Sequence, residues 1–86
     1  MYNSIKEFKN YIKGKKVAVL GIGISNAPLI RYIYGMGACI TAFDMAEKEK
    51  LAQRLRELAD IDIKYSLGKD YLSRLKGFEL IFKTPI

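Results

Sequence analysis

The residues with the clearest chemical meaning form a glycine-rich segment that runs from Gly21 to Asn26 and reads Gly-Ile-Gly-Ile-Ser-Asn. Gly21 permits a tight turn, and Gly23 leaves room where the phosphates of a ligand could approach the backbone. Free N–H groups at the start of the following helix would face those phosphates, helped by the helix dipole. Ser25 is placed to cap this helix and to add a hydroxyl donor. The segment therefore predicts a site for a phosphorylated ligand.

Asp44 lies 23 residues beyond Gly21, at the end of a predicted strand, where NAD enzymes place the acid that holds a ribose. The dinucleotide fingerprint, however, calls for a third glycine at the position of Asn26. An NAD(H)-sensing or nucleotide-sensing regulatory domain is therefore an alternative interpretation. A purely structural interpretation also stays open, in which the glycines form a turn, Ser25 is only a cap and Asp44 only faces solvent.

Strand-like and helix-like segments alternate around these residues, which is typical of a parallel sheet with crossover helices. Residues 16–20 form a continuous apolar run, as expected for a strand buried on both faces. The pattern predicts further strands at 39–43, 61–65 and 79–83, a short leading helix from Ser4, and helices from about Asn26 to Gly35, over 46–59 and over 70–76.

Right-handed crossovers arrange these strands in the order 3-2-1-4, with helices on both faces. The expected fold is thus α/β and Rossmann-like, in a single domain that spans residues 1–86. Strand 4 would be an apolar edge that further strands should cover, so we expect the domain to be truncated.

Composition narrows the class of protein. No apolar run approaches the roughly 20 residues of a membrane span, and the lysine-containing start does not resemble a signal peptide. Cys39 is the only cysteine and histidine is absent, which excludes an internal disulfide and a Cys/His zinc site. We expect Cys39 to be an inert core residue and the protein to be cytoplasmic, without a membrane partner.

The formal net charge of +6 raises the hypothesis of nucleic-acid binding. The basic residues, however, are spread from Lys6 to Lys83, and only Lys13, Lys15 and Lys16 form a tight group. A solvated surface or a small phosphorylated ligand explains this charge better than a nucleic acid does.

Four features in a fixed order resemble the N-terminal domain of the Mur ligases, and specifically of the members that add D-glutamate. The similarity covers nearly all of this chain but only the first of the three domains of that family. The features are a lysine pair, strand and G-x-G-x-S turn over 15–25, a helix that leads into Gly37-Ala38 and a strand ending in Asp44, the segment Ser66-Leu67-Gly68, and the ending Phe-Glu-Leu-Ile-Phe-Lys-Thr-Pro over 78–85.

The resemblance implies that this domain binds the UDP group of UDP-N-acetylmuramoyl-L-alanine. Asp44 would lie beside the uracil or ribose. Some members of the family follow this acid with threonine and arginine, whereas this chain has Met45 and Ala46. Carried over by position, the residues that would bind UDP are Gly21, Gly23, Ile24, Ser25, Asn26, Asp44, Thr84 and Pro85.

The resemblance also implies that these residues perform no catalysis and bind no cofactor or metal. ATP and magnesium would serve the complete ligase, which activates the substrate carboxylate as an acyl phosphate before D-glutamate attacks. The central ATPase domain and the C-terminal domain of that ligase would be the protein partners of this domain. The Thr-Pro motif of the family continues with glycine, whereas this chain has Ile86.

Overall fold

The computed structural model describes residues 4–22 and 26–83. Within these ranges a four-stranded parallel sheet has the order β3-β2-β1-β4. Its strands are β1 (Lys16–Leu20), β2 (Cys39–Asp44), β3 (Lys64–Leu67) and β4 (Leu80–Lys83). The order and the parallel pairing confirm the predicted Rossmann-like α/β fold.

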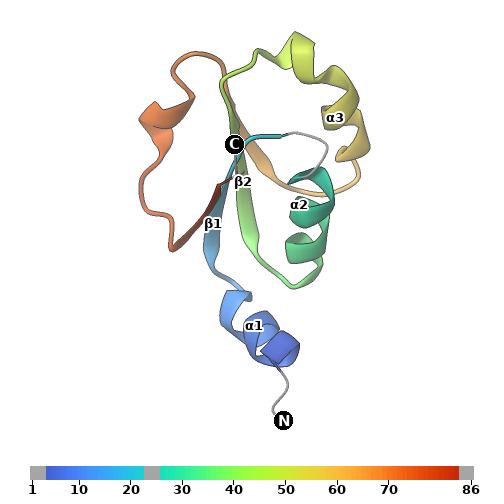
Figure 1. Ribbon diagram of the computed structural model, residues 1–86, viewed down its shortest axis with the longest axis vertical. Coiled ribbons are helices and arrows are strands. Elements are labelled where there is room, and N and C mark those ends of the chain that lie inside the picture. The colour runs from blue at the N-terminus through green and yellow to red at the C-terminus, as the bar shows by residue number, and fades with distance from the viewer. Residues whose placement is uncertain (1–3, 23–25, 84–86) are drawn as a thin grey trace.

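One face of the sheet is covered by α2 (Asn26–Gly35), the 3-10 turn η1 (Lys48–Leu51) and α3 (Ala52–Glu57), as Figure 1 shows. Alternate residues of β1 and β2 point to this face, because successive side chains of a strand point to opposite sides. Together with side chains from the helices they form the hydrophobic core, which includes Val17, Val19, Ile40, Ala42, Ile30, Ile33, Leu51 and Leu58.

The other face is covered by the segment that joins β3 to β4, which lies on the opposite side of the sheet in Figure 1. Phe43 of β2 is fully buried here, and its ring meets the ring of Phe78 edge-to-face at a centroid distance of 5.4 Å. Ser66 of β3 donates a hydrogen bond to the Tyr71 carbonyl (2.8 Å) and accepts one from Arg74 Nε (2.9 Å). These contacts hold the connecting segment against the carboxyl half of the sheet.

The leading helix α1 (Ser4–Ile12) extends beyond the amino ends of the strands (Figure 1). Its last residue, Ile12, is fully buried, whereas Ile5 is exposed, so the end of the helix packs against the core and its start does not. Gly14 then turns the chain with φ +76° and donates its N–H to the Gly37 carbonyl at 2.9 Å. This bond connects the start of β1 to the turn that follows α2.

Three predicted segments differ from the structure. The helix expected over 46–59 is a 3-10 turn followed by the short helix α3, and the helix expected over 70–76 is only the 3-10 turn η2 (Tyr71–Arg74). The third strand occupies Lys64–Leu67 rather than 61–65, because Ile61 and Ile63 pack against the core from the connection that leads into β3. Apolar burial alone made that connection resemble a strand.

Candidate functional site

The predicted site lies where the strands end. Leu20 of β1 pairs with Phe43 of β2 on one side and with Lys83 of β4 on the other. The chain continues from β1 to β2 on one side and later returns to place β4 on the other side of β1, so the strand order reverses between β1 and β4. In open α/β sheets, ligands bind in the crevice outside the carboxyl ends of the strands at such a switch point.

Gly21 begins the loop after β1 in a backbone conformation that favours glycine. Its φ is +100°, and its N–H donates a hydrogen bond of 2.6 Å to the Phe43 carbonyl. A side chain at this position would strain the backbone. Gly21 therefore takes the turning role that the sequence predicted, while remaining attached to β2.

Asp44 connects the glycine loop to the loop that follows β2. Its Oδ2 accepts the N–H of Ile22 at 2.7 Å, and its Oδ1 accepts the N–H of Ala46 at 2.8 Å. The interpretation that Asp44 only faces solvent is therefore wrong. Because each carboxylate oxygen has two lone pairs, Asp44 keeps acceptor capacity for a ligand while it positions both loops.

Asn26, the first residue of α2, is buried and uses its side-chain amide within the protein. Its Nδ2 donates to the Gly21 carbonyl at 2.8 Å and to the Leu20 carbonyl at 3.3 Å. These bonds attach the start of the helix to the end of β1. They also give a structural reason for an asparagine where a dinucleotide fingerprint would have glycine.

Gly68 adds a third loop to this end of the sheet, and sequence reasoning did not assign it to the site. Its N–H donates to the carbonyls of Asp44 (3.0 Å) and Ala46 (3.2 Å), and its φ is +92°. A Cβ at this position would lie 2.8 Å from Glu47 Oε1. The available signal was a glycine between the strand predicted at 61–65 and the helix predicted at 70–76.

The structure thus brings together Gly21, Asn26 and Asp44 from the set predicted to bind UDP. The other five members lie outside the described residues: Gly23, Ile24, Ser25, Thr84 and Pro85. These five residues belong to two short segments, one directly after Ile22 and the other directly after Lys83.

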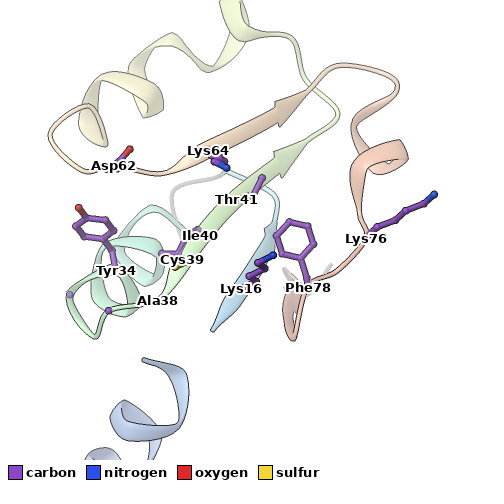
Figure 2. Close-up of a pocket in the computed structure, with 12 residues that line it drawn as sticks. Lys16, Tyr34, Ala38, Cys39, Ile40, Thr41, Asp62, Lys64, Lys76 and Phe78 are labelled. Atoms are coloured by element: carbon purple, nitrogen blue, oxygen red, sulfur yellow. The ribbon is translucent and has the colours of Figure 1, made fainter. Parts of the chain in front are cut away.

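A cavity lies elsewhere, at the amino ends of the strands (Figure 2). It has a volume of about 800 Å³, and its lining includes Lys16, Cys39 and Lys64, the first residues of β1, β2 and β3. Cys39 is exposed here, so the expectation of a core cysteine is wrong. It is the first residue of β2, at the amino end of the sheet, where the strand is not yet covered.

The described residues also bear on metal and membrane sites. Within residues 4–22 and 26–83, no three cysteine or carboxylate side chains are grouped so that they could hold a metal ion. No helix in these same ranges is both long enough and apolar enough to cross a membrane.

The sequence is similar to those of curated ligases, although no protein-family model matches it. It is 53% identical to the UDP-N-acetylmuramoylalanine–D-glutamate ligase of Ruminiclostridium cellulolyticum, 56% to that of Acetivibrio thermocellus and 51% to that of Clostridium perfringens, over 99% of this chain in each case. The chain spans 18–19% of the length of these relatives, at their N-terminal end. The resemblance inferred from the order of the motifs is thereby confirmed.

A solved structure supports the fold. A putative zinc-dependent alcohol dehydrogenase from Rhodobacter sphaeroides aligns with a TM-score of 0.56 and 31% identity, over 67% of this chain and 22% of that chain. The alignment is consistent with the Rossmann-like sheet described above.

Proposed function

Because this chain corresponds to the N-terminal part of the D-glutamate-adding Mur ligases, we propose that it binds the UDP group of UDP-N-acetylmuramoyl-L-alanine. In the complete ligase, this binding would hold the substrate for the addition of D-glutamate during peptidoglycan synthesis. The identity of 51–56% to ligases with that activity in their names supports the assignment.

The observation that carries the proposal is the contact between the Asp44 carboxylate and the N–H of Ile22. It places the start of the glycine loop beside the loop after β2, at the switch point of the sheet. Phosphates would be bound by the backbone N–H groups of the glycine segment and by the helix that follows it. The residues proposed to surround the UDP are Gly21, Gly23, Ile24, Ser25, Asn26, Asp44, Thr84 and Pro85.

Uracil recognition would depend on Asp44 and on backbone groups, because Met45 and Ala46 lack charged or hydrogen-bonding side chains. Met45 is 67% exposed beside Asp44 and provides an apolar surface at this end of the sheet. Because few side chains would contact the base, we expect the chain by itself to bind the UDP compound weakly. The expected dissociation constant is about 1 mM, equivalent to a binding free energy of about 4 kcal/mol.

The remaining chemistry would belong to the rest of the ligase. The 86 residues contain no G-x-x-G-K-[ST] loop for ATP, so phosphoryl transfer and magnesium binding would use other domains. We place the ligase in the cytoplasm, with a UDP-sugar as its small-molecule partner and with neither nucleic acid nor membrane as a ligand.

An NAD(H)-sensing domain is the alternative that the glycine loop allows. One contact counts against it. Asn26 occupies the third-glycine position with a buried amide bonded to the Gly21 carbonyl. A dinucleotide would need close approach along the helix, where its fingerprint has glycine.

The test is a two-dimensional NMR titration of the ¹⁵N-labelled chain with UDP-N-acetylmuramoyl-L-alanine and, separately, with NADH. Shifts of the Ile22, Asp44 and Met45 amides with the UDP compound alone would support the proposal. Shifts with NADH alone would replace it with the sensing function. A dissociation constant below 1 µM for the UDP compound would contradict the expected weak affinity, because it requires a binding free energy about 4 kcal/mol more favourable.

A further inference from the structure

The cavity at the amino ends of the strands is separate from the proposed UDP site, because it lies at the opposite end of the sheet. Lys16, Thr41 and Lys64 belong to three adjacent strands and project from one face. Strand pairing places Lys16 beside Cys39 and Thr41 beside Lys64, and Cys39 and Thr41 are two residues apart on β2. Figure 2 shows these side chains around the cavity.

The segment that joins β3 to β4 covers the carboxyl half of this face of the sheet and leaves the amino half uncovered. Phe43, the next residue of β2 on the same face, is covered by the ring of Phe78. Toward the amino end, Thr41 is only half-buried and Lys16 and Lys64 are exposed. The open half of the face, bounded by Phe78, is therefore a cavity of about 800 Å³, within the range of roughly 300–1,000 Å³ typical of small-molecule sites.

The cavity carries positive charge that the protein neutralises only in part. Within residues 4–22 and 26–83, neither Lys16 nor Lys64 forms an ion pair through its ammonium group. The neighbouring carboxylate of Glu79 accepts the backbone N–H of Lys16 at 3.0 Å and lies 3.7 Å from Lys15 Nζ, so it is already paired. Asp62 also lines the cavity and offsets part of the charge. Lys76 adds a further positive charge, although Figure 2 shows its side chain pointing outward.

We propose that this cavity binds a small anion with two adjacent phosphate groups, held by the ammonium groups of Lys16 and Lys64 and by the Thr41 hydroxyl. Ammonium groups form strong charge-assisted hydrogen bonds with phosphate oxygens, and the hydroxyl supplies a further donor. Lys16 and Lys64 lie two strands apart and are offset by two residues along the strand direction. This geometry separates their Cα atoms by roughly 12 Å. Two extended lysine side chains reduce this gap to the length of a diphosphate.

The binding test uses inorganic pyrophosphate and ADP as separate probes of the ¹⁵N-labelled chain. We expect saturable shifts of the Thr41 and Lys64 amides with both compounds, and weaker binding as salt screens the charges. Binding of ADP about threefold or more tightly than pyrophosphate would assign the site to nucleoside phosphates that use the Phe78 ring. Equal affinities would assign it to the phosphate groups alone. Shifts that do not saturate would overturn the proposal.

Single substitutions separate this site from the UDP site and from general attraction to a basic chain. Lys16→Gln and Lys64→Gln should each weaken pyrophosphate binding, followed at Thr41, about threefold to tenfold. The shifts that the UDP compound causes at Ile22 and Asp44 should stay unchanged. Lys50→Gln is the matched control, because Lys50 is an exposed lysine of η1 outside the cavity lining. An equal loss in Lys50→Gln and Lys64→Gln would show that only net charge attracts the anion.

Discussion

The carboxylate of Asp44 accepts the N–H of Ile22 at 2.7 Å, across 22 residues of sequence. With its second oxygen on the N–H of Ala46, it holds two loops in one arrangement at the carboxyl end of the sheet. A single side chain therefore fixes Ile22, near the start of the glycine segment, relative to the loop after β2. In the proposed complex, this arrangement would reduce the ordering that binding requires.

Asp44→Asn tests this arrangement through stability. The amide can accept only one of the two N–H groups well, because its nitrogen is a donor, so we expect a loss of about 1–3 kcal/mol in the free energy of unfolding. Urea denaturation followed by circular dichroism measures the change. Asp62→Asn, an exposed carboxylate at the opposite end of the sheet, should stay within about 0.5 kcal/mol of the wild type. Equal denaturation midpoints for the wild type, Asp44→Asn and Asp62→Asn would show that the lost hydrogen bond contributes nothing to stability.

Phe43→Ala tests the packing of the second sheet face. Phe43 is fully buried against Phe78, so its removal leaves a cavity and should cost about 3–5 kcal/mol. Small domains are stabilised by only about 0.05–0.15 kcal/mol per residue, so this variant should be largely unfolded or close to it. Thermal melting of Tyr32→Ala, which truncates a 55% exposed aromatic residue, provides the comparison. Similar melting temperatures for both variants would contradict the packing role.

A pair of glycine substitutions tests backbone conformation. Gly68→Ala places a side chain at φ +92° and should destabilise the chain by about 1–2 kcal/mol. Gly35→Ala, at the end of α2 with nothing within 4 Å of the added Cβ and an ordinary φ, should instead stabilise it by about 0.4–1 kcal/mol. Urea midpoints that move in the same direction for the two variants would refute this distinction.

The contact between Arg31 and Asp60 predicts a difference in acid sensitivity. Arg31 donates to both carboxylate oxygens at 2.7 and 3.0 Å, and this hydrogen bonding lowers the pKa of Asp60 below its ordinary value. A lowered folded-state pKa gives stability that is present above the unfolded pKa and is lost as pH falls through the folded pKa. Between pH 5 and pH 2, Asp60→Asn should therefore lose less stability than the wild type. Parallel losses in melting temperature for the two proteins would exclude a contribution from this pair, which salt should also weaken.

Local pattern was sufficient for the main features of the fold. The apolar run of residues 16–20 and its alternation with helical segments predicted a parallel sheet, and the handedness of crossovers predicted the order 3-2-1-4. The glycine turn was recognisable because Gly21 stands directly after the most apolar strand. These features depend on residues that are close in sequence, which is why periodicity and glycine placement reveal them.

Only the tertiary structure decided which groups meet. Asp44 accepts the N–H of Ile22, and Gly68 donates to the carbonyls of Asp44 and Ala46, so each contacts a different loop, and these contacts depend on how the strands assemble. The same reason accounts for the errors. Ile61 and Ile63 are apolar because the core needs them, yet hydrogen bonding to β2 begins only at Lys64. Cys39 lies in an apolar segment, but the connection that buries Phe43 does not extend far enough to cover it.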